Sequence, residues 1–230
     1  MFENKRFGLE QAVLNGSKTM TRRLVGNRLT EDDIKAYQQG KLKAKDIVTA
    51  HYKIGEVVAI AQSYKDAGMK AGDSVYKRAT LHNGSKVWEF CKASEVAGWE
   101  NKMFVLALAM PHRIRITDIK IERLHDISDD DCFREGIIPI TWRQHLKQDW
   151  NDFTPQKVVD HHVYSLEKFR NGIEDAWADS EPDEYIAESP SVAFAALIIK
   201  MMGKKVWEEN PYVFAYSFEL VKQQGRKLKV

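Results

Sequence analysis

The sequence predicts an α+β protein in which helices surround a small, strongly bent β-barrel. Apolar and polar residues alternate in two stretches, 113–124 and 212–221, and this period of two is typical of strands. The expected helices and strands do not alternate along the chain as they would in a doubly wound parallel sheet. The length of 230 residues fits one domain with sizeable insertions, so we expect a single domain over 1–230.

The expected elements near the N-terminus are short. Residues 5–15 have the apolar pattern of a helix that ends at Gly16, a residue type that tolerates the left-handed conformation after a helix. The stretch "TMTRRLV" (19–25) is then expected as a short strand or extended loop. A glycine turn precedes the next expected strand, Val57–Ala61.

Three segments have the composition of insertions. Residues 27–53 are polar and charged and predict loop and helix, and 65–100 predict a loop-rich insertion with a hairpin at the favoured two-residue turn Asn83-Gly84. Residues 141–188 are expected to be a helical insertion. Apolar residues within 159–173 recur at helical spacing and predict a helix there.

The strongest strand signal lies in 103–124, "MFVLALAMPHRIRITDIKIERL". The alternation of its isoleucines changes phase at Thr117-Asp118, which a β-bulge would explain. The closing stretch 212–221 predicts a strand with four apolar residues on one face: Phe214, Tyr216, Phe218 and Leu220.

Two further helices have recognisable ends. Ser128 is expected to cap a short helix, with Asp131 as its capping-box partner and Gly136 at its end. Ser189-Pro190 opens a second helix, which Gly203 closes.

Composition excludes several classes of protein. Lys and Arg total 35 against 33 Asp and Glu, and the net charge of +2 is too small to indicate nucleic-acid binding by itself. The longest strongly apolar stretch, "VAFAALII", is too short to cross a bilayer, and the N-terminus lacks the apolar stretch of a signal peptide. We therefore expect a cytoplasmic protein without a membrane partner, in which Cys91 and Cys132 form no disulfide.

The stretch "GSKTMTRR" (16–23) is the most informative motif. A phosphate-binding P-loop needs glycine directly before its Lys-Ser/Thr pair and another glycine five residues earlier, whereas Ser17 and Ala12 occupy those places. That interpretation is rejected. The alternatives are a solvated basic loop and the edge of a pocket.

The motif resembles a known family. Gly16, Lys18, Thr21 and Arg23 reproduce the G-x-K-x-x-T-x-R signature of the ASCH family, particularly its phage-type and bacteroidete members. Three further blocks are similar to the family: "YKIGEVVAI", "RIRITDIKIERLHDISDDDCFREGI" and "VWEENPYVFAYSFELV". The resemblance implies a PUA-like β-barrel with surrounding helices and two long insertions. One departure is at 62–64, where larger phage-type members commonly have Glu and Trp and this chain has Gln-Ser-Tyr.

The resemblance implies RNA or a modified nucleoside as the partner. In small bacterial members that hydrolyse the amide of N4-acetylcytidine, the matching residues imply Lys18 as base, Thr21 as nucleophile and Glu135 as proton donor. The substrate-binding residues would be Gly16, Arg22 and Arg23. The alternative is a non-catalytic module that binds RNA or a modified nucleotide.

The implied chemistry sets physical conditions on these residues. A threonine hydroxyl is a poor nucleophile unless a base takes its proton, and Lys18 can do so only if burial or a nearby cation lowers its pKa. Arg22 and Arg23 supply nearby cations. Glu135 ends a short helix, where the macrodipole disfavours a carboxylate charge and so suits a proton donor.

Other candidate groups carry weaker signals. Trp207, Tyr212 and Phe214 are suited either to stack a base or to fill the core. Adjacent histidines, His161-His162, point to different sides of a helix, so no metal and no cofactor is expected.

Overall fold

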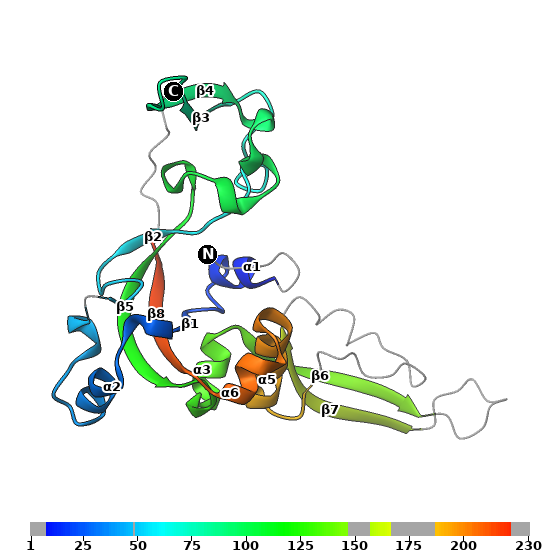
Figure 1. Ribbon diagram of the computed structural model, residues 1–230. Coiled ribbons are helices and arrows are strands. Elements are labelled where there is room, and N and C mark those ends of the chain that lie inside the picture. Colours follow the sequence, from blue (N-terminus) through cyan, green and yellow to red (C-terminus); the bar gives the residue numbers. More distant parts are fainter. Residues whose placement is uncertain (1–7, 48, 147–156, 167–186, 222–230) are drawn as a thin grey trace. The chain divides into compact units, whose positions relative to one another are not determined.

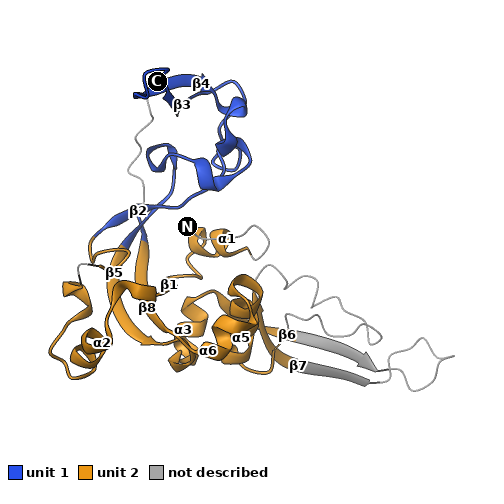
Figure 2. Ribbon diagram, viewed as in Figure 1, with its two compact units in different colours: residues 1–2, 56–115, 220–230 blue, residues 3–55, 116–219 orange. Residues whose placement is uncertain are grey.

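The computed structural model describes residues 8–47, 49–146, 157–166 and 187–221 (Figure 1). The protein is mixed α+β, with a curled antiparallel sheet that forms half of a barrel and with few helices, which confirms the coarse fold class. The chain divides into two compact units (Figure 2). Unit 1 is built mainly from Glu56–Arg115, and unit 2 from Glu3–Gly55 and Ile116–Glu219.

The main sheet has four strands in the order β1-β8-β5-β2. Their bounds are β1 Met20–Leu24, β8 Tyr212–Val221, β5 Arg113–Arg123 and β2 Val57–Ala59. β1 pairs antiparallel with β8, so that Thr21 lies opposite Tyr216, and β2 pairs antiparallel with the start of β5. The two stretches with the clearest alternation are therefore neighbours in one sheet, as expected from their sequence.

The closing strand is buried more completely than its pattern predicts. All residues from 213 to 218 are buried, including Val213, Ala215 and Ser217 between the expected apolar positions, whereas Leu220 is exposed. Burial therefore extends to the face opposite the four predicted apolar residues. β8 lies between β1 and β5 and is covered on both sides, as is typical of an interior strand.

The long strand starts later than its apolar run suggests. The first part of the run forms 3₁₀ turns at Lys102–Phe104 and Ala107–Ala109. β5 begins only after Pro111, which has no amide proton to donate to a strand ladder. Within β5, two exposed residues, Thr117 and Asp118, separate the buried pairs of isoleucines. This is the expected change of phase.

The helices keep the predicted caps. Their bounds are α1 Leu9–Leu14, α2 Glu31–Gln38, α3 Asp129–Arg134, α5 Pro190–Met202 and α6 Lys204–Glu209. Ser128 and Ser189 accept hydrogen bonds from backbone amides in the first turns of α3 and α5, and Gly16 has a φ of 84° after α1. No helix in the described segments is long and apolar enough to cross a membrane.

Two hairpins complete the described structure. β3 (Ser74–Thr80) and β4 (Lys86–Lys92) form the expected hairpin, but residues 81–85 connect them instead of a two-residue turn, with Gly84 at a φ of 81°. β6 (Ile137–Leu146) pairs with β7 (Lys157–Leu166).

The helix expected over 159–173 was wrong for residues 159–166. Three valines in "KVVDHHVYSL" are spaced compatibly with a helix, but β-branched residues favour a strand when a long partner is available. Residues 167–173 lie outside the described part of the chain.

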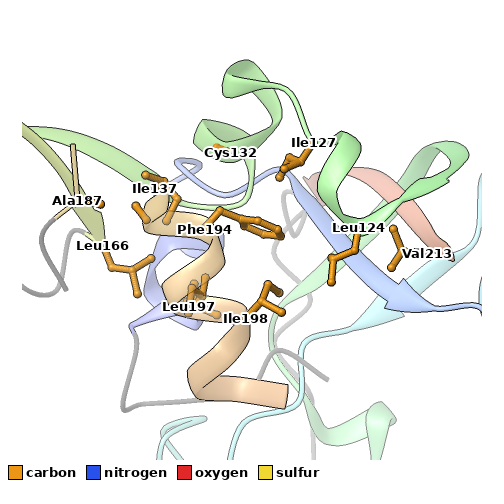
Figure 3. Close-up of a cluster of buried hydrophobic side chains, with 12 residues drawn as sticks. Leu124, Ile127, Cys132, Ile137, Leu166, Ala187, Phe194, Leu197, Ile198 and Val213 are labelled. Atoms are coloured by element: carbon orange, nitrogen blue, oxygen red, sulfur yellow. The ribbon is translucent and has the colours of Figure 1, made fainter. Parts of the chain in front are cut away.

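Unit 2 has an apolar core around α5. Figure 3 shows Phe194, Leu197 and Ile198 of this helix among residues of the hairpin and the sheet, such as Ile137 and Leu166. Each fully buried side chain of this size stabilises the fold by about 1.5–3 kcal/mol.

Unit 1 has its own core, and a glycine allows close packing within it. A Cβ added at Gly98 would lie 2.6 Å from Tyr64 Cε2 and 3.0 Å from the carbonyl oxygen of Phe104. We expect Gly98→Ala to lower the free energy of unfolding by about 1–3 kcal/mol, because the tyrosine and backbone must shift. Chemical denaturation measures this, with Gly72→Ala as the matched control because that position faces open space. Equal stability of the two variants would contradict the packing.

Candidate functional site

The signature segment is fixed at both ends before β1 begins. The Lys18 amide donates to the carbonyl oxygen of Ala12 in α1, and the Thr19 amide donates to that of Arg134 at the end of α3, both at 2.8 Å. The left-handed Gly16 allows the turn between α1 and this segment. Backbone contacts therefore hold the signature against the C-terminal end of α3.

Lys18 and Glu135 meet in the interior, although 117 residues separate them. Their exposed fractions are 3% and 4%. Lys18 Nζ donates to the carbonyl oxygen of Glu135 at 2.8 Å and to its carboxylate Oε2. Gly136, at a φ of 103°, ends α3 beside Lys18. The structure thus brings together two of the three expected catalytic residues.

Arg22 occupies the middle of a larger buried charge network. Its guanidinium donates to Glu135 Oε1 at 3.0 Å, to Asp131 Oδ2 at 3.1 Å and to Glu122 Oε1 at 2.5 Å and 3.1 Å. It also lies over the Phe194 ring, 5.6 Å from the centroid. Arg22, a predicted substrate-binding residue, is buried, because strand alternation turns it toward α3 and α5.

Two more cations close the network at its edge. Lys120 contacts Asp131 Oδ2 and lies 3.0 Å from Glu122 Oε2. Arg134 donates to Asp131 Oδ1 at 3.3 Å and to the Ser217 hydroxyl at 2.7 Å. We call the seven residues the charge network: Lys18, Arg22, Lys120, Glu122, Asp131, Arg134 and Glu135.

Burial and pairing shift the pKa values in the charge network in different directions. Burial lowers the pKa of Lys18, and the attraction of Glu135 does not fully offset it. Burial also acts on Arg22, but the carboxylates of Glu135 and Glu122 outweigh it and raise the pKa of this guanidinium. For Asp131, burial is outweighed by Lys120 and then by the arginines, so its pKa is lowered. The condition set for Lys18 as a base, a lowered pKa, is met.

Thr21 is buried on the other side of β1. Successive side chains of a strand point to opposite faces, so Thr21 faces away from Arg22 and lies beside its register partner Tyr216. Within the described chain, no hydrogen bond joins the Thr21 hydroxyl to Lys18 or Glu135. Thr21 is therefore not bonded directly to the other two expected catalytic residues.

The remaining candidate residues lie outside the charge network. Gly16 is exposed at the end of α1, and Arg23 is half-buried with its Nη1 donating to the carbonyl oxygen of Arg22 at 3.0 Å. Phe214 is fully buried in the sheet, Trp207 packs on the core of unit 2, and Tyr212 lies under the Arg123 guanidinium at 3.9 Å.

The adjacent histidines lie on strand β7 and not on a helix. His162 is exposed near the Thr141 hydroxyl. No group of three or more His, Cys, Asp or Glu side chains in the described segments is placed to hold a metal ion.

Four members of the charge network were missed as site residues. Asp131 and Glu135 are four residues apart, which places both carboxylates on one face of α3. Lys120 and Glu122 alternate with buried isoleucines on β5. These spacings were visible in the sequence, but the partner for all three carboxylates, Arg22, was predicted to bind substrate. Asp131 was expected to close a capping box, and its carboxylate instead binds the three neighbouring cations.

The comparisons with known proteins leave the family open. No family model matches this chain, and neither a curated protein nor a solved structure matches it.

Removal of the Glu135 charge would leave Lys18 and Arg22 short of a counter-charge in the interior. We expect Glu135→Gln to lower the free energy of unfolding by about 3–5 kcal/mol. Glu208→Gln, which removes an exposed partner of Lys204, is the control and should cost no more than about 1 kcal/mol. Chemical denaturation compares the two. Equal costs would show that the charge network adds little stability.

Asp131 predicts a dependence of stability on pH. Its pKa is lowered by folding, so its charge stabilises the protein above the unfolded value of about 3.9, and this contribution is lost as pH falls through the folded pKa. We expect Asp131→Asn to be less stable than the wild type at neutral pH, with the difference shrinking below about pH 4. Denaturation at several pH values measures this. Asp129→Asn, an exposed neighbour on α3, should follow the wild-type profile.

Proposed function

We propose that this chain is an ASCH-type, PUA-like domain that binds a nucleoside, free or within RNA, at Lys18 and Glu135. The observation that carries the proposal is the buried contact between these two residues, which the signature and the short-helix block supply from distant parts of the sequence. The order of elements supports it, because β5 leads into α3 and the closing strand β8 lies beside β5 in a curled sheet.

The paired groups suit the edge of a cytosine base. A carboxylate accepts a hydrogen bond from the N4 amino group, and an ammonium donates to the ring acceptors beside it. Glu135 and Lys18 present this acceptor and donor side by side. Both are closed to solvent and bonded to each other, so a ligand must separate them and replace their mutual contact.

One observation favours binding without catalysis. Thr21 faces away from Arg22 and, in the described part of the chain, makes no hydrogen bond to Lys18 or Glu135. The net charge of the chain does not by itself give affinity for RNA. Lys18 and Arg22 are paired with carboxylates, so contacts to phosphates would have to come from exposed cations.

The second candidate is an amidohydrolase acting on N4-acylated cytidine, favoured by the lowered pKa of Lys18. The Thr21 oxygen would attack the acyl carbon while Lys18, as the neutral amine, takes the hydroxyl proton. As the C–N bond breaks, protonated Glu135 would give its proton to the leaving N4, and water would then hydrolyse the acyl-threonine ester. This sequence requires Lys18 Nζ to leave Glu135 and reach Thr21.

Calorimetry with cytidine and N4-acetylcytidine tests binding. We expect Glu135→Gln to weaken the affinity about tenfold or more, because a hydrogen bond to a charged group is lost. Glu208→Gln should bind as the wild type does, and circular dichroism checks the fold of each variant. Absence of binding to either nucleoside by the folded wild type would refute the proposed site.

Incubation with N4-acetylcytidine and analysis of the products separates the two candidates. If the protein releases cytidine and acetate, Thr21→Ala and Lys18→Ala should each lose most activity and the double variant should be scarcely worse, because the residues act as a unit. Thr21→Ser should keep part of the activity. Binding without any hydrolysis would leave the non-catalytic function.

A further inference from the structure

The β3–β4 hairpin belongs to unit 1 (Figures 1 and 2). It carries an exposed aromatic surface that the proposed nucleoside site does not use. The exposed fractions of Tyr76, Trp88 and Phe90 are 47%, 56% and 68%. Tyr76 and Phe90 are register partners, and their ring centroids lie 4.1 Å apart. Large aromatic side chains with this exposure on one hairpin mark a binding surface.

Strand alternation puts all three rings on one face. Val75 is buried and Cys91 is half-buried on the opposite face, where both belong to the core of unit 1. The inward face thus stabilises the hairpin, and the aromatic face contributes nothing to that core. We call Tyr76, Trp88 and Phe90 the aromatic platform.

The charges beside the aromatic platform are positive. Strand alternation places Lys86 and Lys92 of β4 on the same face as Trp88 and Phe90. Glu89 lies on the other face, with its carboxylate 3.8 Å from Lys77 Nζ. Lys92 makes a loose exposed pair with Glu95 at 3.8 Å, which costs little to break. Among the described side chains of this face, every charged group is a cation.

We infer that the aromatic platform binds single-stranded nucleic acid. Unpaired bases stack on exposed aromatic rings, and flanking lysines attract the phosphates; this combination is the usual one for single strands. An apolar protein partner would not need cations at both ends of the surface. The platform belongs to unit 1 and the Lys18–Glu135 pair to unit 2, so the inference does not rest on the proposed nucleoside site.

Fluorescence anisotropy of a labelled oligouridylate of about twelve nucleotides tests the inference on the full chain. We expect Trp88→Ala and Phe90→Ala each to weaken binding by about five- to a hundredfold, since each removes a stacking ring. Trp88→Phe should restore most of the affinity. Phe104→Ala, which removes an exposed aromatic outside the hairpin, should bind as the wild type does.

Salt and competition make the test specific. Lys86→Gln should reduce the slope of log affinity against log salt by about 0.7, the value for one phosphate contact on a single strand. A duplex of matched length should compete poorly because its bases are already stacked. Glu208→Gln, the exposed control variant in unit 2, should leave oligonucleotide binding unchanged.

Two results would overturn the inference. The first is no binding of the oligonucleotide at low salt, which would leave the aromatic face to a protein partner. The second is equal binding by the wild type, Trp88→Ala and Phe90→Ala. Unchanged thermal midpoints of these variants confirm that any loss reflects the surface and not unfolding.

Discussion

The contacts of the Arg22 guanidinium are the constraint on which unit 2 depends. A charged group closed to solvent is costly unless it is paired and fully hydrogen-bonded. Arg22 meets this requirement only because β5 supplies Glu122 and α3 supplies Asp131 and Glu135. The position of α3 against β1 is thus specified by charge and geometry as well as by apolar packing.

The same network governs what the Lys18–Glu135 pair can do. Lys18 is stabilised as a cation by Glu135 and destabilised by its burial, and Glu135 is shared with Arg22. A ligand that takes the Glu135 carboxylate from Lys18 leaves Arg22 in place as its second partner. Recognition through these residues is therefore an exchange of hydrogen bonds within a preformed electrostatic environment, with little change in net charge.

Sequence alone predicted the elements whose signals are local. The caps at Ser128 and Ser189, the left-handed Gly16 and the phase change in β5 each depend on a few neighbouring residues, and all were confirmed. The helix expected in place of β7 failed because valine spacing fits both periods and only the partner strand decides between them. The surroundings of Arg22 were not predicted for a similar reason: they are made by residues about a hundred positions away.

The pairing of Lys18 with Glu135 came from family resemblance and not from spacing. Nothing local in the sequence shows that these positions meet. Strand alternation would have indicated the opposite faces of Thr21 and Arg22, but only after β1 had been accepted as a regular strand.

The pairing of β1 with β8 has a consequence for synthesis of the chain. These strands lie near opposite ends of the sequence, with Thr21 opposite Tyr216. At about 5–20 residues per second, a ribosome needs roughly 10–40 s to make the intervening segment. During that interval the buried face of β1, with Arg22, has no partner strand. The nascent chain must hold an unpaired edge of β1 until β8 emerges, although the carboxylates that compensate Arg22 emerge earlier, from 122–135. This makes the period before β8 emerges one in which chaperones and misfolding compete for β1.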